Sequence, residues 1–261
     1  MPVETIEGSG GPPVLLTCDH ASNAVPRALG ALGLAPGLIE RHIGWDIGAA
    51  AVTRRLAALL RVAAILAGYS RLVIDCNRDP ADASSIPEES DGIAVPGNRA
   101  LPLSSRAERR AACFEPYHRA VAAGLAAMRA AGTVPALLSI HSFTPVMRGF
   151  VRPWHVGILW DRDGRIPLPL IEALGSDPAL VVGDNQPYSA REPAGYTVRH
   201  HAAASGLPHV AVELRQDLIA TAAGAEAWAA RLQRALAPIL ARREIYGIER
   251  ASGNPPGASP Q

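Results

Sequence analysis

The sequence of 261 residues contains no lysine, so all 25 of its basic residues are arginine. A Walker-type phosphate-binding loop needs its lysine, and chemistry through a Schiff base or pyridoxal phosphate needs a lysine amine. The absence of lysine therefore excludes these classes of enzyme. Arginine remains available to bind carboxylates through two parallel hydrogen bonds.

Cysteine is scarce as well, and Cys18, Cys76 and Cys113 form no CxxC pair. The opening residues MPVETIEGSGGPP lack the basic and apolar segments of a signal peptide. No apolar run approaches the ~18 residues that span a bilayer. Three cysteines without a signal peptide are typical of a reducing compartment. We therefore expect a cytoplasmic protein without a disulfide framework.

The sequence also lacks a charge of one sign in excess, since its formal net charge is +1 and no basic or acidic block occurs. Bulk electrostatics therefore predicts neither a nucleic-acid partner nor an anionic membrane partner. The expected partner is a small molecule, and the oligomeric state stays open. The length and the 48% of apolar residues suit one α/β domain. We expect a flexible N-terminus over residues 1–12, this domain over 13–250 and a disordered tail over 251–261.

Short apolar runs alternate with longer amphipathic runs along the chain, which is typical of βα units. This order predicts an α/β fold with a mixed, largely parallel sheet flanked by helices. In such a sheet, polar residues at the carboxyl ends of the strands gather along one edge. The predicted strands cover 13–19, 71–75, 134–140, 155–160, 179–182 and 208–214; the predicted helices cover 46–60, 105–131, 195–204 and 222–243; and 76–103 is an irregular loop.

Two histidines follow predicted strands directly, His20 in CDHASNAVP and His141 in SIHSFTP. Either one alone is better interpreted as a loop histidine that is hydrogen-bonded to backbone. Two histidines at the carboxyl ends of different strands in one sheet are expected to converge. Histidine is a common ligand of divalent metal ions, so the pair predicts a metal site.

A catalytic metal site normally has a third protein ligand and an open position for water. Asp46, in HIGWDIG at a predicted helix start, is the candidate. The alternative for Asp46 is a carboxylate that is stabilised by the helix dipole. His42 is either a further ligand or a surface residue. Asp19 either orients His20 from behind or lies outside the site.

Glu213 lies near the end of an otherwise apolar run in VAVELRQD. A carboxylate in such a position has to be paired or functional, because burying an unpaired charge costs too much. One interpretation is an ion pair with Arg215 or another arginine. In a metal hydrolase, Glu213 is instead the expected general base, which takes a proton from the attacking water and passes it to the leaving amine.

Arginine side chains beside the predicted strand ends are either surface residues or carboxylate clamps. They are Arg71 and the Asn77–Arg78 pair in YSRLVIDCNRD, and Arg199 in GYTVRHHA. Schemes with a side-chain nucleophile find less support. The chain has no G-x-S-x-G elbow, and its GSGG stretch precedes the first predicted strand instead of following it.

The ordered series CDHASNAVP, HIGWDIG, YSRLVIDCNR, EPYH, IHSF, GYTVRHHA and AVELRQD resembles the N-formylglutamate amidohydrolase family, from about Leu15 to Asp217. The resemblance implies a phosphorylase/peptidyl-hydrolase-like fold, similar to the zinc carboxypeptidases. It also implies hydrolysis of N-acyl amino acids such as N-formylglutamate, which yields formate and glutamate. CDHAS stands where a PHSG-like stretch is expected, which indicates a divergent branch.

The resemblance further implies a role for each residue singled out above. It makes His20, Asp46 and His141 the ligands of one divalent metal ion, expected to be zinc, with aspartate standing where other members have histidine. It makes Glu213 the general base and gives Arg71 the stabilisation of the oxyanion. Binding of the substrate falls to Asn77 and Arg78 at its α-carboxylate, and to Tyr196 and Arg199 in the late loop.

The leading hypothesis is therefore a zinc-dependent amidohydrolase that cleaves the N-acyl amide of a small acidic amino acid. A carboxypeptidase-like peptidase or another N-acyl amino acid hydrolase could use the same metal site. A hypothesis of another class is a non-catalytic protein whose arginines bind an acidic metabolite. Metal content and turnover discriminate between these hypotheses.

Overall fold

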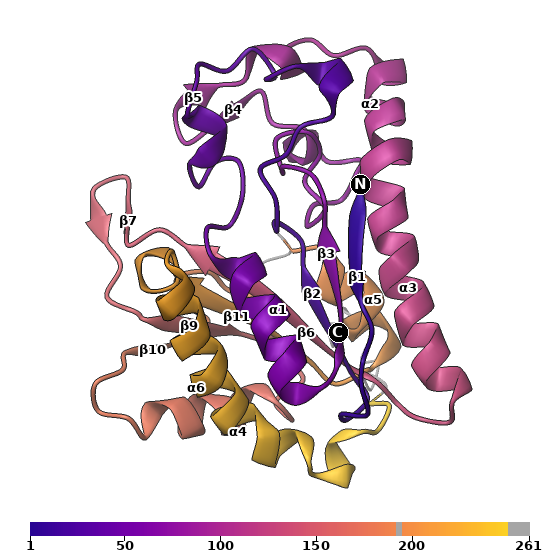
Figure 1. Cartoon of the computed structure of the whole chain (residues 1–261), viewed down its shortest axis with the longest axis vertical. Helices are drawn as coiled ribbons and strands as arrows, with labels where there is room; N and C mark the ends of the chain where they lie inside the picture. Colours follow the sequence, from indigo (N-terminus) through magenta and orange to yellow (C-terminus); the bar gives the residue numbers. More distant parts are fainter. Residues whose placement is uncertain (192–194, 250–261) are drawn as a thin grey trace, which may run out of the picture.

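A seven-stranded sheet with the strand order β1-β3-β2-β6-β11-β9-β10 forms the centre of the protein (Figure 1). The computed structural model describes residues 1–191 and 195–249. Strands β3, β2, β6 and β11 run parallel, as do β9 and β10, whereas β1 and β9 pair antiparallel with β3 and β11. The predicted mixed, largely parallel sheet is confirmed. Its strands are β1 (Val3–Ile6), β2 (Val14–Cys18), β3 (Ala63–Ala67), β6 (Ala136–Phe143), β9 (Val156–Leu159), β10 (Val182–Asp184) and β11 (His209–Arg215).

Helices cover both faces of the sheet, which is why its central strands are apolar on both sides. Successive side chains of β2 point to opposite faces: Leu16 joins the core on one face and Leu15 the core on the other. The first face is covered by α1 (Ala49–Leu60), α4 (Pro167–Gly175) and α6 (Ala222–Leu240), and the second by α3 (Glu115–Ala130) and α5 (Thr197–His201).

Irregular segments between residues 21 and 114 lie beyond the carboxyl ends of β2 and β3 and form a third apolar cluster. This part contains α2 (Leu103–Arg109), the hairpin of β4 (Glu89–Ser90) and β5 (Ile93–Ala94), and a π-helical turn (Arg110–Phe114) that joins α2 to α3 (Figure 1). A second hairpin, of β7 (Val146–Met147) and β8 (Phe150–Val151), follows β6. Short 3-10 turns cover Arg27–Leu29, Leu38–Glu40, Ala83–Ser85, Pro96–Asn98, Ala203–Ser205, Gln216–Leu218 and Arg243–Ile245.

The strand predicted over residues 71–75 is wrong, because this segment is a turn. Leu72, Val73 and Ile74 are all buried in the third apolar cluster. Their backbone pairs locally: the Val73 N–H donates to the Ser70 carbonyl, and no ladder forms. A short, wholly apolar run has no period of its own, so its pattern does not separate a buried strand from a buried turn.

The N-terminus is also more ordered than predicted. Residues 3–6, expected to be flexible, form β1 and pair with β3 at the edge of the sheet. The remaining elements differ mainly in their ends, with the strand predicted over 179–182 lying at 182–184. The predicted tail over 251–261 lies outside the described residues. Among the described helices, none has both the length and the apolar character needed to cross a bilayer.

Gly48 precedes α1 with φ +83°, and a Cβ atom there would lie well inside contact distance of the Ile219 carbonyl oxygen. Gly37 has a similar φ of +82° but open space around it. We expect Gly37→Ala to lower the free energy of unfolding by about 1 kcal/mol, the cost of a left-handed backbone. Gly48→Ala should lower the free energy of unfolding by a further ~1–3 kcal/mol, because its Cβ atom would be overpacked against the Ile219 carbonyl. Urea unfolding measures both, and equal losses would contradict the close approach.

Candidate metal centre and active site

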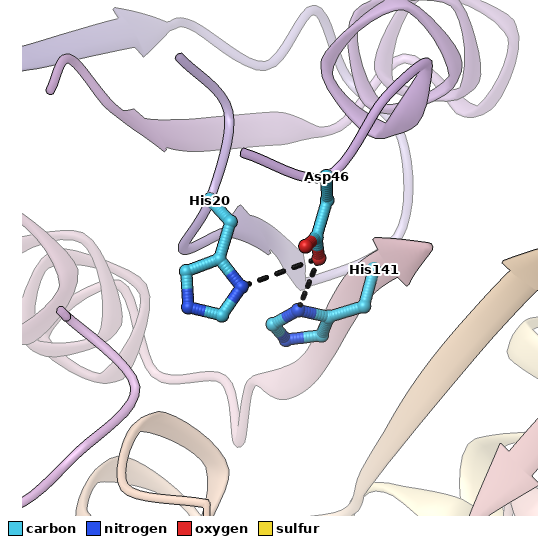
Figure 2. A group of neighbouring side chains, drawn as sticks. All are labelled: His20, Asp46 and His141. Carbon is cyan, nitrogen blue, oxygen red and sulfur yellow. Dashed lines mark hydrogen bonds and ion pairs between the residues drawn. The ribbon is translucent and has the colours of Figure 1, made fainter. Parts of the chain in front are cut away.

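Two histidines and one aspartate converge at the carboxyl end of the parallel strands. His20, Asp46 and His141 each offer one ligand atom, and these atoms lie within 4.8 Å of one another. Figure 2 shows the Asp46 carboxylate between the two imidazole rings: its Oδ2 is 3.2 Å from Nδ1 of His20 and 3.0 Å from Nδ1 of His141. All three side chains are buried. The structure thus brings the three predicted ligands together.

The backbone around these residues explains why they meet. His20 comes just after β2 and His141 lies in β6, two parallel neighbours in the sheet. Asp46 approaches from the segment before α1, where its N–H donates to the His20 carbonyl at 3.0 Å. The Ser142 N–H donates to Asp46 Oδ2 at 3.2 Å. Hydrogen bonds to both strands therefore fix the position of the Asp46 carboxylate.

Each histidine contacts a second carboxylate through its other ring nitrogen. Nε2 of His20 lies 2.7 Å from Oδ1 of Asp75, and Nε2 of His141 lies 3.0 Å from Oδ2 of Asp19. Such carboxylates fix the tautomer and the orientation of a metal-binding histidine, leaving Nδ1 for the ion. Asp19 was considered as a partner of His20, but the structure pairs it with His141. Sequence reasoning missed Asp75, although a carboxylate after a buried run needs a partner.

A dense set of hydroxyl groups surrounds Asp19. The Tyr117 hydroxyl on α3 donates to Asp19 Oδ1 at 2.7 Å, and the Thr197 hydroxyl on α5 donates to the same oxygen at 2.6 Å. Ser139 contacts both Asp19 Oδ2 and His141 Nε2. Burial opposes ionisation of Asp19, but its hydrogen bond with His141 and the charges of both histidines lower its pKa below the usual range. Tyr117 and Thr197 explain why the EPYH and GYTVRHHA motifs belong to the site.

Arg71 lies beside the centre and connects two of its carboxylates. Its Nη2 donates to Asp75 Oδ2 at 2.8 Å, and its Nη1 contacts Asp46 Oδ1 at 3.4 Å. Burial raises the pKa of Asp75, but the charges of Arg71 and His20 outweigh it and hold that pKa well below the usual range. Arg71 is part-buried, so its guanidinium can face both these carboxylates and a bound ligand.

Glu213 lies opposite His141 in the register of β11 and β6, so both side chains are on the same face of the sheet. Its Oε2 is buried and has no hydrogen-bond partner among the residues that the structure describes. Burial raises the pKa of Glu213 to about 7. The suggested ion pair with Arg215 does not form, because Arg215 bonds to Asp217 at 2.9 Å. A buried carboxylate with a free oxygen and a pKa near neutrality is suited to general-base chemistry.

The four residues predicted to bind substrate are less uniformly placed. Asn77 Oδ1 accepts the N–H groups of Tyr196 and Thr197 at 2.8 and 3.0 Å, so only its amide nitrogen can meet a carboxylate. Arg78 bonds to the Asn77 carbonyl at 3.1 Å. The Tyr196 ring stacks on His200 with centroids 4.6 Å apart. Arg199 is exposed on α5 and directly precedes His200 in the sequence.

His42, the other candidate ligand, lies outside the centre. Its Nε2 is 3.1 Å from Oδ2 of Asp91, and both side chains are partly exposed. The surface interpretation of His42 therefore holds.

The charges of the centre favour a cation. Four carboxylates lie around the two histidines, those of Asp19, Asp46, Asp75 and Glu213, and the guanidinium of Arg71 contacts two of them. Burial lowers the pKa of His141, but Asp19 and Asp46 more than compensate and raise it well above the usual value. Two imidazole nitrogens and one carboxylate oxygen form a donor set typical of catalytic zinc sites, in which water takes a further position. The residues present therefore fit a divalent metal ion.

Comparisons with known proteins identify the family of the chain. The sequence model of the family described as N-formylglutamate amidohydrolase matches residues 12–220, which include all the residues of the centre. A crystal structure of gene product Atu2144 from Agrobacterium tumefaciens is 36% identical, with a TM-score of 0.88 and coverage of 92% of this chain and 94% of that chain. No curated protein matches the sequence of the chain.

A more distant structure shows the same fold. The N-formylglutamate amidohydrolase from Ralstonia eutropha JMP134 is 19% identical to the chain, with a TM-score of 0.60. The likeness covers 92% of this chain and 95% of that chain. The arrangement of strands that positions the centre is therefore shared across nearly the full length of both proteins.

Removal of a ligand tests the metal site directly. We expect His141→Ala to weaken zinc binding by more than about 100-fold, because it removes one of the three candidate ligands. Loss of an outer carboxylate that only orients a ligand should have a smaller effect. His42→Ala is the matched control and should keep the affinity, since His42 pairs with Asp91 away from the centre. Zinc titration of the chelator-treated protein measures both. Equal affinities in the two variants would exclude His141 as a ligand.

Asp75→Asn tests the outer carboxylate. The substitution keeps the size of the side chain but removes the charge that orients His20, so we expect zinc affinity to fall about 10- to 100-fold. Asp91→Asn changes the same kind of histidine–aspartate pair outside the centre and should leave zinc affinity unaltered. If both variants bind zinc like the original chain, Asp75 does not support the metal site.

Proposed function

Because the chain belongs to the N-formylglutamate amidohydrolase family, we propose that it hydrolyses the amide of a small acidic N-acyl amino acid, represented by N-formylglutamate. The chain is an amidohydrolase by family. The observation that carries the finer proposal is the buried Glu213, whose Oε2 has no hydrogen-bond partner within the described part of the chain and which lies on the same sheet face as His141. His20, Asp46 and His141 would hold one divalent ion, for which zinc is our expectation.

The ion, when bound, supplies Lewis acidity that polarises the amide carbonyl and acidifies water. Glu213 takes one proton from the attacking water, whose oxygen forms the new bond to the carbonyl carbon. The same carboxyl group then gives that proton to the nitrogen as the carbon–nitrogen bond breaks. The products are formate and the free amino acid. A carboxyl pKa near 7 allows Glu213 to accept and to return a proton at neutral pH.

We assign to Arg71 the stabilisation of the negative charge that develops on the carbonyl oxygen. Its guanidinium is held in place by Asp75 and by Asp46, one of the proposed ligands. A preorganised cation at this point needs no rearrangement during the reaction. Arg78 and the amide nitrogen of Asn77 are the groups that we assign to the substrate α-carboxylate. We also assign Tyr196, which directly precedes α5, and Arg199 on α5 to this side of the proposed site.

A panel of substrates separates the proposal from its alternatives. N-formyl, N-acetyl and N-succinyl amino acids, compared with short peptides, identify the acyl group and detect a carboxypeptidase-like activity. A zinc-loaded protein that binds glutamate without turning over any of them would support a non-catalytic binding protein. We place the reaction in amino-acid catabolism in the cytoplasm, a compartment in which the buried, unpaired Cys18, Cys76 and Cys113 would remain thiols.

Glu213→Gln tests the proposed base. The amide is nearly isosteric but cannot accept a proton, so we expect kcat for formate release from N-formyl-L-glutamate to fall about 100- to 10,000-fold. Zinc content should stay unchanged, because Glu213 is not one of the three ligands. Glu226→Gln is the control, since Glu226 is exposed and pairs with Arg55 on the surface. A Glu213 variant with full activity would refute the assignment.

A further inference from the structure

Arg152 is a buried cation to which sequence reasoning gave no role. Its side chain follows β8 and is only 7% exposed. Nη1 donates to the Thr144 carbonyl at 3.4 Å, the Thr144 hydroxyl at 3.2 Å and the Tyr188 hydroxyl at 3.2 Å. All these acceptors are neutral, and within residues 1–191 and 195–249 no carboxylate pairs with Arg152. A buried guanidinium without a counter-charge is costly, so a site that retains one has a use for an anion.

The strand geometry places this cation on the catalytic face of the sheet. His141 and Phe143 are two residues apart in β6, so their side chains share a face and lie about 6.6 Å apart along the strand. The Arg152 guanidinium carbon lies 5.8 Å from the centroid of the Phe143 ring. The Arg152 N–H donates to the Pro145 carbonyl at 2.8 Å, which closes the base of the β7–β8 hairpin two residues after the end of β6. Arg152 thus packs against Phe143, the residue that follows the proposed metal ligand His141 on the same face of β6.

Tyr188 contacts Arg152 and lies near enough to Glu213 to be affected by its charge. Its ring centroid is 5.0 Å from the Arg152 guanidinium, and its oxygen accepts a hydrogen bond from Nη1. Burial and the nearby charge of Glu213 raise the pKa of Tyr188, so its hydroxyl keeps its proton. Since the oxygen is already an acceptor, that proton is available for a ligand. The Tyr188 residue is 42% exposed, which leaves this donor accessible.

We propose that Arg152 and Tyr188 form a carboxylate-binding subsite for the side chain of the substrate, and that this subsite makes the enzyme selective for acidic amino acids. The inference rests on the proposed function and specifies its substrate. Arg152 offers a charged donor, and Tyr188 offers a neutral one beside it. Arg71 is a poorer candidate, because Asp46 and Asp75 already balance its charge. A bound side-chain carboxylate would provide the counter-charge that Arg152 lacks among residues 1–191 and 195–249.

The test compares two substrates that differ only in side-chain charge, N-formyl-L-glutamate and N-formyl-L-glutamine. We expect Arg152→Gln to lower kcat/KM for the glutamate substrate about 10- to 100-fold, mainly through KM, as loss of a charged hydrogen bond does. Hydrolysis of the glutamine substrate should change less than about threefold, which is within the effect of a neutral hydrogen bond. An equal loss on both substrates would show a structural role and overturn the proposal, as would no loss on either.

Three further variants keep the test sound if Arg152→Gln folds poorly. Tyr188→Phe removes one hydroxyl and should lower selectivity for the acidic substrate about three- to tenfold. Arg152→Lys keeps the charge and should restore part of the selectivity that Arg152→Gln loses. Arg54→Gln removes an exposed arginine that pairs with Glu4 and should alter neither substrate. Unchanged selectivity in Tyr188→Phe together with Arg152→Lys behaving like Arg152→Gln would count against the subsite.

Binding of L-glutamate and L-glutamine to the zinc-loaded protein, measured by calorimetry, separates failure of the subsite from failure of the proposed function. If the original chain hydrolyses neither N-formyl substrate, the proposed function fails. The subsite is then still supported when the chain prefers glutamate and Arg152→Gln abolishes that preference. A chain that hydrolyses N-formyl amino acids but binds both products equally would overturn the subsite alone.

Discussion

The carboxylate of Asp46 is the interaction on which the rest of the site depends. One of its oxygens faces both imidazole rings and the Ser142 N–H, and the other faces Arg71. The group therefore joins β2, β6, the segment before α1 and the turn after β3. Such a buried carboxylate is tolerated only while these partners surround it, because an uncompensated buried charge is strongly destabilising. The candidate metal centre and the packing of α1 against the sheet are thus parts of one arrangement.

The turn over residues 71–78 shows why an irregular segment is needed beside that carboxylate. In a strand, Leu72 and Val73 would point to opposite faces of the sheet. In the turn, both are buried in the same apolar cluster, while Arg71 and Asp75 meet each other and the centre. The Asn77 N–H also donates to Asp75 at 2.8 Å, and the Asn77 side chain holds the start of α5. A single turn thus links the third apolar cluster, an outer carboxylate and the late loop.

The parts of the site that could be predicted are those with a local signal. His20, His141 and Glu213 each end or follow an apolar run, and parallel strands bring such positions to one edge of a sheet. Most strands of the sheet were predictable for the same reason, because they are short apolar runs between amphipathic segments, whereas β1 and β3 were not predicted. Asp46 was a candidate third ligand from its position at a predicted helix start, with a helix-start carboxylate as the alternative, and the family resemblance added support for the ligand role.

The parts that could not be predicted depend on contacts between distant residues. The hydroxyl groups of Tyr117 on α3 and Thr197 on α5 both donate to Asp19. No local sequence pattern predicts either hydrogen bond. Asp19 was considered as the partner of His20 because the two are adjacent in sequence. Adjacent side chains leaving a strand point to different sides, so Asp19 instead faces His141 on the neighbouring strand. Arg152 was missed because its role depends on contacts with Thr144 and Tyr188, and no motif in the sequence connects these residues.

Charge balance explains why an acidic substrate would need a cation separate from the catalytic centre. The centre holds four carboxylates, and Arg71 is already paired with two of them. A divalent ion would offset much of the remaining negative charge, but both cations are then engaged and offer little net attraction to a distant carboxylate. Arg152 stands outside this set, paired with neutral groups and packed on Phe143. A cation kept apart in this way can bind a substrate anion without weakening the pairs that hold the centre together.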